Sequence, residues 1–309
     1  MDSIQKQTQF FRSLPLGYYH LCSDGWQKGK LFHTDEQYAF GVSGLALSTL
    51  IHGVKIYAYE LMPNHFHILL CATGEQCLSL FYYIIRRINK KLKEAGFPCL
   101  PDDYWFKLVP IKNKEQMKDL IVYLARNKFE KGACTPFGHK WGTGCLPYNQ
   151  LAEFITGTQV RDMSQRELEQ LVGSRTSLPA DWEIHPVLGI LPKNFVCIDK
   201  VLQLFPTVKE YTTRMVKQYE SAVIIADSVG ESIEWSAEEA KDILMNLCNR
   251  LFPGKRLYDL TVDEKGRLAV QADSLYHLPT PTLSKHLQLS EYVIRQFLHS
   301  KDYGLKRIK

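Results

Sequence analysis

Two histidines two residues apart, His65 and His67, enter a hydrophobic run directly after the pair Pro63 and Asn64. Side chains at positions i and i+2 of a β-strand share one face of the sheet. Both imidazoles therefore point the same way, while Phe66 between them turns towards a core. This pattern predicts a two-imidazole metal site at the start of a strand. The alternative is that one histidine caps the strand and the other is an ordinary polar residue.

The first 130 residues alternate between β-type and α-type patterns. The predicted elements, in chain order, are a strand at 17–22, a helix at 35–52, strands at 54–61 and 65–71, a helix at 78–95, a strand at 104–109 and a helix at 114–127. Four strands covered by helices indicate an α+β fold of the ferredoxin-like or RRM-like kind. We therefore expect a four- to five-stranded antiparallel sheet with helices packed on it.

The predicted helix 114–127 has a clear N-terminal signal, because Asn113 and Gln116 form a capping box. Its apolar stripe consists of Met117, Leu120, Ile121 and Leu124. Tyr123 and Asn127 are four residues apart and lie together on the flank of this stripe. We expect a tyrosine in that position to be half buried at the edge of the core.

Positive charge is concentrated in the first half of the chain. Residues 1–150 hold 18 Lys and Arg against 12 Asp and Glu, a net +6, whereas residues 151–309 hold 20 against 21, a net −1. Five of the cations crowd the predicted helix 78–95, namely Arg86, Arg87, Lys90, Lys91 and Lys93. A basic helix with aromatic neighbours suits a polyanion such as nucleic acid, although a solvated helix face explains the same run.

A chain of 309 residues with 45% hydrophobic content is long enough for two or three domains. A stretch rich in Gly, Pro and Thr before residue 150 predicts the end of the first domain, so we divide the chain into 1–150, 151–230 and 231–309. The middle part suggests no chemistry. The last part is helical, and its segments 282–287 and 290–300 are spaced like a helix-turn-helix. Its second helix would offer Tyr292, Arg295 and Gln296 to duplex DNA.

The sequence contains no feature of a secreted or membrane protein. Its first residues lack the basic and apolar regions of a signal peptide, and its apolar stretches are too short to span a bilayer. The eight cysteines include no C-x-x-C pair, so structural zinc is not indicated. We expect a cytoplasmic protein with reduced thiols and no membrane partner.

Two imidazoles and an oxygen ligand suit a divalent ion that keeps open coordination positions and can polarise a phosphate or a carbonyl. A metallo-β-lactamase-like site would read H-x-H-x-D-H, but apolar residues follow His67 here. A two-histidine phosphodiesterase needs a second H-x-[ST] motif, which the chain does not contain. An amidohydrolase barrel needs repeated β/α units, which the region after residue 151 does not show. This last class is the weaker enzyme alternative.

The run 62–70, together with its flanks 54–60 and 123–127, resembles the single-tyrosine HUH transposases, and more narrowly the REP-associated tyrosine transposases. The resemblance spans roughly residues 15–150. It implies that His65 and His67, with Asn127, bind Mg²⁺ or Mn²⁺. It also implies that Tyr123 is the nucleophile.

The activity implied by the resemblance is metal-dependent cleavage and strand transfer of single-stranded DNA through a 5′-phosphotyrosine, with recognition of hairpins. The basic run and Arg126 would contact phosphates. The sequence departs from the family where residues 128–133 replace a usual proline and insert an acidic residue, Glu130.

Two alternatives to the transposase stay open. One is a DNA-binding transcriptional or architectural regulator with a helix-turn-helix and an inactive or domesticated HUH domain. The other is a metal-dependent hydrolase of small molecules. Whether the protein is a monomer or a homodimer also stays open.

Overall fold

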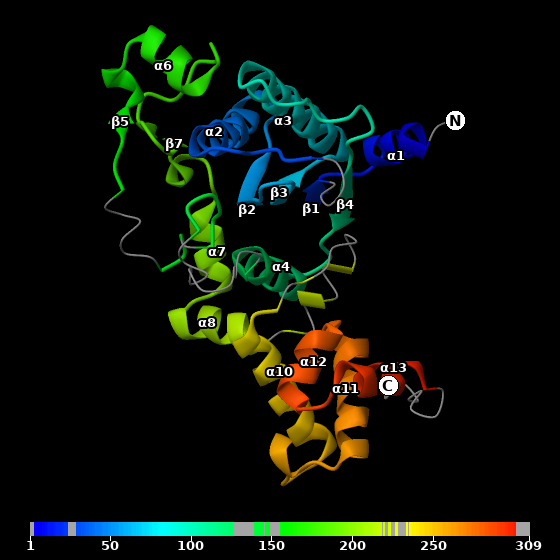
Figure 1. Cartoon of the computed structure of the whole chain (residues 1–309). Coiled ribbons are helices and arrows are strands. Elements are labelled where there is room, and N and C mark those ends of the chain that lie inside the picture. Colours follow the sequence, from blue (N-terminus) through cyan, green and yellow to red (C-terminus); the bar gives the residue numbers. More distant parts are fainter. Residues whose placement is uncertain are drawn as a thin grey trace. The chain divides into compact units, whose positions relative to one another are not determined.

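The four strands expected in the first 130 residues form one antiparallel sheet in the computed structural model of the protein (Figure 1). The structure describes residues 3–23, 29–126, 139–144, 146–148, 155–217, 219, 222–223, 226–227, 233 and 235–300. The strand order is β2-β3-β1-β4, and all three neighbouring pairs are antiparallel. One helix connects β1 to β2 and another connects β3 to β4, which is the ferredoxin-like arrangement. The predicted α+β class is therefore confirmed.

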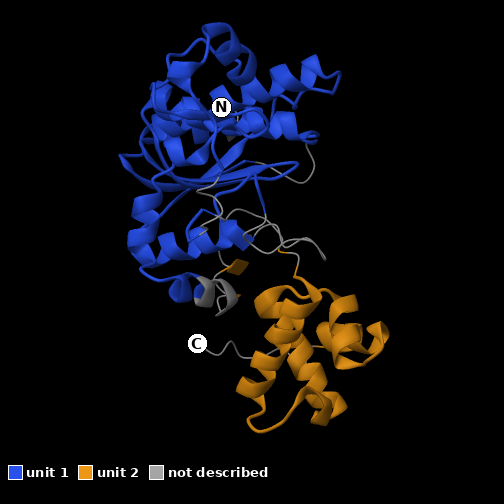
Figure 2. Ribbon diagram, turned by 90° about the vertical axis from the view of Figure 1, so that its left-hand side faces the viewer, with its two compact units in different colours: residues 1–128, 134–215 blue, residues 129–133, 216–309 orange. Residues whose placement is uncertain are grey.

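The chain divides into two compact units, which Figure 2 shows in different colours. Unit 1 comprises residues 1–128 and 134–215, and unit 2 comprises residues 129–133 and 216–309. The expected boundaries at residues 150 and 230 stay a prediction about independent folding. By its contacts, however, the described part of the middle region up to residue 215 packs with the first sheet.

The elements of unit 1 carry the main sheet and its covering helices. They are α1 (Ser3–Arg12), β1 (Gly17–Ser23), α2 (Asp35–His52), β2 (Lys55–Leu61), β3 (Phe66–Ala72), α3 (Gly74–Glu94), β4 (Phe106–Pro110), α4 (Lys114–Arg126), β5 (Thr158–Gln159), the 3₁₀-helix η1 (Val160–Asp162), α6 (Gln165–Val172), β6 (Glu183–His185), β7 (Gly189–Ile190), the 3₁₀-helix η2 (Pro192–Asn194), α7 (Ile198–Leu204) and α8 (Val208–Lys217). The short strands β5, β6 and β7 form a second antiparallel sheet.

The two faces of the main sheet have different chemistry. Leu21 of β1 and Ile68 of β3 belong to the hydrophobic core on the face covered by α2 and α3. Helix α4 covers the opposite face and contacts β2 and β3 (Figure 1). Because side chains alternate along a strand, His67 faces α4. The sheet therefore separates an apolar core from a face that carries the polar residues of interest.

The register of β2 against β3 shifts by one residue at Tyr57, which is typical of a β-bulge. Beyond the bulge, Glu60 lies opposite His67. A register continued from Ile56 without the extra residue would place Tyr59 there instead, because a one-residue shift exchanges the two faces of a strand. The bulge therefore places a carboxylate beside the histidine.

Helix α3 begins at Gly74, four residues earlier than the sequence predicts. Thr73 and Gln76 form a capping box around its first turn. A Cβ atom at Gly74 would lie 1.7 Å from the carbonyl oxygen of Phe11, so the close approach of α1 requires glycine at this position. The first turn of α3 is thus determined by a cap and by packing rather than by apolar periodicity.

Unit 2 is helical in its described part. Its elements are α10 (Ala237–Leu251), the 3₁₀-helix η3 (Leu257–Asp259), α11 (Val262–Tyr276), α12 (Thr280–Leu287) and α13 (Glu291–His299). The capping box of Ser236 and Glu239 opens α10 as predicted. Helices α12 and α13 are joined by a short turn in which Gln288 is left-handed, with φ of 54°. The two helices lie within two residues of the expected bounds 282–287 and 290–300, but their use as a DNA-binding helix-turn-helix stays a prediction.

Within the described residues, no helix is both long enough and apolar enough to span a membrane. The cytoplasmic location stays a prediction from the sequence.

Candidate active site

Strand β3 and the residue before it present both histidines on the α4 face of the sheet. His65 is 7% exposed and His67 is fully buried. On the neighbouring strands, Cys22 of β1 and Glu60 of β2 are the direct cross-strand partners of His67. Directly opposed residues in an antiparallel sheet share a face. A row of chemically active side chains therefore crosses three strands at the level of His67.

Nδ1 of His65 and Nδ1 of His67 each have a hydrogen-bond partner. Nδ1 of His67 lies 3.0 Å from Nε2 of His20, and Nδ1 of His65 lies 2.8 Å from Oδ1 of Asn64. The two rings of His65 and His67 are nearly perpendicular, at 88°, with centroids 4.9 Å apart. When a histidine binds a metal, its second nitrogen normally donates to such a partner, which orients the ring. This arrangement assigns Nε2 of both rings as the nitrogen suited to a metal.

Helix α4 places Tyr123 against the histidines. The ring of Tyr123 lies edge-on to His67, with centroids 5.7 Å apart at 85°, and edge-on to His20, with centroids 6.5 Å apart at 72°. Tyr123 is 3% exposed, so the expectation of a half-buried tyrosine is wrong. Tyr123 lies on the flank of α4 that faces the sheet. Its ring packs there against the side chains of His67 and His20.

Glu60 is a buried carboxylate next to His67. Its Oε1 lies 3.1 Å from Nε2 of His139, and the pair is almost excluded from solvent. A Cβ on Gly142 would lie 1.7 Å from a carboxylate oxygen of Glu60, so this segment approaches β2 as closely as a glycine allows. The sequence did not identify Glu60 or His139 as site residues.

His20 and Cys22 were also missed by the sequence analysis, although a signal was present. Both lie in the predicted strand 17–22 at positions i and i+2, which is the same spacing as that of His65 and His67. Two strands that each carry a pair of ligand-type residues would converge on one site only if they paired in this register. Single-sequence reasoning does not supply that register.

Two further predicted site residues, Arg126 and Asn127, follow Tyr123 in the sequence. Asn127, the expected oxygen ligand, lies outside the described residues. Arg126 is only 9% exposed, and its contact with phosphates stays a prediction.

The chain is distantly similar to a solved structure. No family model matches the chain, and no curated protein matches it. Among solved structures, the chain is similar to a REP-associated tyrosine transposase bound to a REP hairpin, with 15% sequence identity and a TM-score of 0.37. The match covers 55% of this chain and 94% of that chain. A likeness this distant says nothing about the roles of individual residues.

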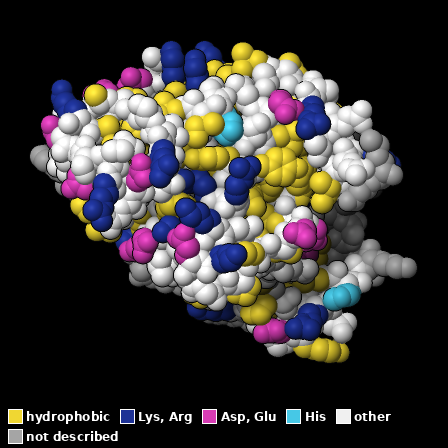
Figure 3. All heavy atoms as spheres, turned by 90° about the horizontal axis from the view of Figure 1, so that it is seen from above, with side chains coloured by type: hydrophobic (Ala, Val, Ile, Leu, Met, Phe, Trp, Pro, Cys, Tyr) yellow, Lys and Arg dark blue, Asp and Glu magenta, His cyan; other side chains and the backbone are white. Residues whose placement is uncertain are grey.

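The basic run of α3 does not lie beside Tyr123, because α3 covers the opposite face of the sheet (Figure 1). Arg86, Lys90 and Lys93 are exposed. Lys90 and Lys91 both pair with Glu94, at 3.9 and 3.2 Å, and Nζ of Lys91 also lies 3.4 Å from Glu36. Viewed from that side, Figure 3 shows Lys and Arg side chains interspersed with Asp and Glu.

Arg87 is the clearest correction to the predicted DNA contacts. It is 9% exposed, and its guanidinium donates to the carbonyl oxygens of Val172 and Gly173 at the end of α6. The same group lies 3.9 Å from the centroid of the Phe40 ring. Arg87 therefore joins α3 to α6 in the interior of unit 1, because helix-terminal carbonyls need donors and the guanidinium supplies them.

We expect Arg87→Ala to lower the free energy of unfolding by about 2–4 kcal/mol, since it leaves the buried carbonyl of Val172 and the partly buried carbonyl of Gly173 without their donor and removes a stacked side chain. Urea denaturation followed by circular dichroism measures the effect. The matched control is its exposed neighbour, as Arg86→Ala should change stability by less than about 0.5 kcal/mol. Equal effects of the two substitutions would contradict the buried role.

A cation lies on the α4 face at the level of His67. Lys107 of β4 is the cross-strand partner of Cys22, which in turn pairs with His67, and its side chain is exposed. Alternation along β4 places Lys107 on the same face as the histidines. Sequence analysis missed this lysine because it stands alone and not in a basic run.

Helix α8 holds α4 through charged hydrogen bonds. Arg214 donates to Oδ1 of Asp119 at 2.6 and 3.0 Å and to Oε2 of Glu115 at 2.9 Å. Lys118 donates in the opposite direction, to Glu210 of α8 at 2.8 Å. The hydrogen bond and charge of Arg214 lower the pKa of Glu115. The middle region, to which the sequence assigned no chemistry, thus fixes the helix that carries Tyr123.

We expect Arg214→Ala to loosen α4, so that hydrogen exchange of its amides measured by mass spectrometry becomes faster by about tenfold or more. The reason is that a forked guanidinium with two carboxylate partners is among the stronger surface interactions. Arg175→Ala, which removes an exposed ion pair with Glu169, should leave α4 unchanged. Because the pKa of Glu115 is lowered on folding, its contribution is present above its ordinary pKa and is lost as the pH falls through the lowered value. If hydrogen exchange of the α4 amides is unchanged in Arg214→Ala, the hydrogen bonds between α8 and α4, which we call the α4–α8 clamp, do not hold α4 in place.

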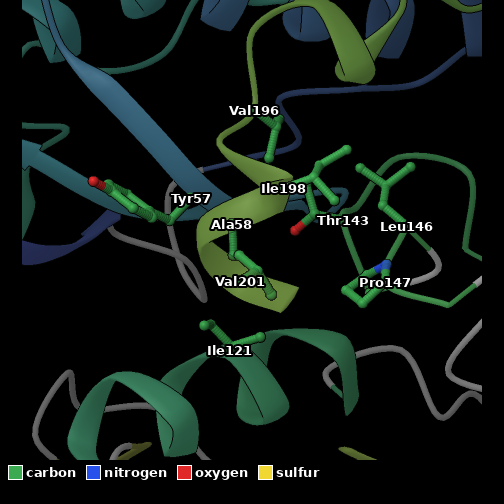
Figure 4. A pocket seen from close by; sticks show the side chains of 10 residues that line it. Tyr57, Ala58, Ile121, Thr143, Leu146, Pro147, Val196, Ile198 and Val201 are labelled. Carbon is green, nitrogen blue, oxygen red and sulfur yellow. The ribbon is translucent and has the colours of Figure 1, made fainter. Parts of the chain in front are cut away.

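A small apolar pocket lies next to α4 but contains none of the predicted site residues. It is lined by Ala58 of β2, Ile121 of α4 and Val201 of α7, with further residues of the segment around Thr143 (Figure 4). Neither histidine of the motif nor Tyr123 contributes to its wall. We interpret this pocket as a packing gap where β2, α4 and α7 meet, and not as a substrate site.

On unit 2, the predicted duplex-reading residues of α13 are at the surface. Tyr292 is 72% exposed, and Arg295 and Gln296 are also exposed. Arg295 forms an ion pair with Glu291 one turn earlier, with the two groups 3.3 Å apart. Their exposure is compatible with DNA contact and equally with a solvated helix face.

Proposed function

We propose that this protein cleaves and rejoins single-stranded DNA through Tyr123, with His65 and His67 holding a divalent metal ion. The observation that carries the proposal is the packing of the Tyr123 ring against His67, 5.7 Å between centroids, on the sheet face that both histidines share. A helical tyrosine directed at a two-histidine strand provides a nucleophile and metal ligands at one place. This arrangement supports a transposase-type nuclease.

The donor set fits a divalent ion. Both imidazoles have their Nδ1 engaged by a polar partner, which leaves Nε2 of each in the orientation that metal ligation needs. Mixed nitrogen and oxygen sites suit Mn²⁺ and Mg²⁺ when water and substrate phosphate fill the other positions. The ion would supply charge that polarises the scissile phosphate. Asn127 stays the proposed oxygen ligand from the protein.

In the proposed reaction, Oη of Tyr123 attacks the phosphorus of the scissile phosphodiester in line. The bond from Oη to phosphorus forms while the bond to the 3′-oxygen breaks. The hydroxyl of Tyr123 loses its proton, and the departing 3′-oxygen gains one. The product is a 5′-phosphotyrosine and a free 3′-hydroxyl. Because the phosphodiester bond is conserved in the covalent intermediate, a second 3′-hydroxyl can attack it and rejoin a strand without ATP.

The protein's own residues contribute positioning. His20 and Asn64 orient the two imidazoles, and the clamp between α4 and α8 holds the backbone of Tyr123. We propose that Lys107 contacts a phosphate of the reacting strand, because it lies on the α4 face at the level of His67. The exposed cations of α3 are proposed only for DNA that extends beyond the site.

A DNA-binding role of unit 2 is proposed as an addition to this activity. The exposure of Tyr292, Arg295 and Gln296 on α13 favours it. In the full chain, Arg295→Ala combined with Gln296→Ala should then weaken duplex binding and leave covalent attachment to single strands unchanged. Duplex binding without any covalent attachment would favour the alternative of a DNA-binding regulator.

The experiment that tests the function uses the full chain with labelled single-stranded hairpins and Mn²⁺ or Mg²⁺. The hairpins are taken from the DNA next to the gene that encodes the protein. A protein-DNA band that survives a denaturing gel is the expected result. The absence of such a band with every hairpin and with both ions would contradict the nuclease assignment.

A further inference from the structure

Three side chains with zinc-binding donor atoms meet on strands β1 and β3, on the sheet face that Tyr123 packs against. His20, Cys22 and His67 each offer one ligand atom, and these atoms lie within 4.8 Å of one another. All three residues are at most 2% exposed. The register explains the cluster, because Cys22 pairs directly with His67 and His20 precedes Cys22 by two residues on the same face.

We propose that His20, Cys22 and His67 form a site for a thiophilic divalent ion such as Zn²⁺, distinct from the magnesium or manganese site of His65 and His67. Zinc binds imidazole nitrogen at about 2.0–2.1 Å and thiolate sulfur at about 2.3 Å in tetrahedral sites, so its donor atoms are spaced about 3.3–3.6 Å apart. Nε2 of His20 and Nδ1 of His67 are already 3.0 Å apart. Small side-chain rotations bring the three donors to this spacing, and water takes the fourth position.

The proton balance of this binding links the two metal sites. The thiol of Cys22 releases its proton to solvent as the bond from sulfur to zinc forms. The proton shared between Nε2 of His20 and Nδ1 of His67 moves to the other nitrogen of the ring that carries it, because both facing nitrogens become ligands. His67 is then protonated at Nε2. A neutral imidazole with zinc on Nδ1 and a proton on Nε2 cannot also bind magnesium or manganese.

The donor chemistry makes the two sites selective. The thiolate of Cys22 favours Zn²⁺ and Co²⁺, whereas Mg²⁺ and Mn²⁺ favour the water and phosphate oxygens that complete the site of His65 and His67. Zinc is therefore expected to occupy the cluster of His20, Cys22 and His67 and to withdraw His67 from the proposed nuclease. That consequence rests on the proposed function, but the zinc site itself does not.

The site is tested by adding Co²⁺ to the full chain and recording its absorption spectrum. The expected result is a thiolate-to-cobalt charge-transfer band that saturates at one equivalent and disappears when Zn²⁺ is added. Cys22→Ser should abolish the band, and Cys71→Ser, a half-buried cysteine of the same sheet, should keep it. A missing band in the natural chain, or a band that persists in Cys22→Ser, would overturn the proposal.

A second measurement needs no variant and covers the case in which Cys22→Ser does not fold. X-ray absorption of the zinc-loaded natural chain should show one sulfur and two imidazoles around the metal. A zinc environment without sulfur would equally overturn the site.

The inhibitory consequence is measured separately. In the Mn²⁺-dependent DNA attachment assay, with each protein compared with its own zinc-free activity, Cys22→Ser should need at least on the order of tenfold more zinc for half inhibition than the natural chain, since even indirect ligand changes weaken metal binding that much. If no attachment occurs with any ion, the proposed function fails while the cobalt spectrum still decides the zinc site. Equal zinc sensitivity of the natural chain and Cys22→Ser would refute the link between the sites.

Discussion

Tyr123→Phe is expected to abolish covalent attachment of the protein to DNA while hairpin binding changes by less than about threefold. The substitution removes only the hydroxyl that would attack phosphorus. The ring that packs edge-on against His67 and His20 remains, so the site keeps its shape. Loss of a buried hydroxyl costs about 1–2 kcal/mol of folding stability, which a domain of this size should tolerate.

Two gels with the same labelled hairpin measure the result. A denaturing gel reports the covalent adduct, and a native gel reports binding. The matched control is Tyr57→Phe, a second buried tyrosine of the same domain whose pKa is raised by burial and by its hydrogen bond to Tyr18. Its hydroxyl therefore resists ionisation, and its removal should leave the adduct unchanged. An adduct that persists in Tyr123→Phe would show that another residue is the nucleophile.

The second large effect is expected at the histidines. His65→Ala and His67→Ala should each lower adduct formation by at least on the order of 100-fold, because each removes one of two imidazole ligands and changes to surrounding residues alone cost 10–100-fold. His20→Ala should cause a smaller loss, of about 10-fold, because His20 only orients His67. The graded order separates the ligands from their positioning partner.

Manganese binding gives a readout that does not depend on activity. Isothermal titration calorimetry should show weaker Mn²⁺ binding in both ligand variants than in the natural chain. The control His52→Gln should bind Mn²⁺ as tightly as the natural chain. His52 is a suitable control because it lies at the end of α2, which covers the other face of the sheet. Circular dichroism must show that each variant is folded, since His67 is fully buried. Activity that is unaffected by EDTA would exclude the metal role.

Local patterns predicted most of the elements and the core of the site. The period of two placed His65 and His67 on one face, and the apolar stripe with its capping box predicted α4 to within a residue. The box of Ser236 and Glu239 likewise marked the start of α10. These features depend on residues a few positions apart, so they can be read from one sequence.

The basic run of α3 shows where local reasoning ends. Arg86 and Arg87 are adjacent and chemically identical, yet the first is exposed and the second is buried against α6. The apolar period places Arg87 nearer than Arg86 to the buried stripe of α3, but it does not reveal the carbonyls that Arg87 contacts. Their environments differ because residues 165–173, far away in the chain, pack on one side of α3 only.

What the sequence by itself determined is which residues form strands and helices and that the two histidines of the motif share a face. Only the tertiary structure decided that β1 pairs with β3 so that His20 and Cys22 join His67, and that the bulge at Tyr57 brings a carboxylate opposite it. It also decided that α4 turns its tyrosine towards this row. The physical reason is that register, helix orientation and burial result from contacts between residues distant in the chain, to which local periodicity is insensitive.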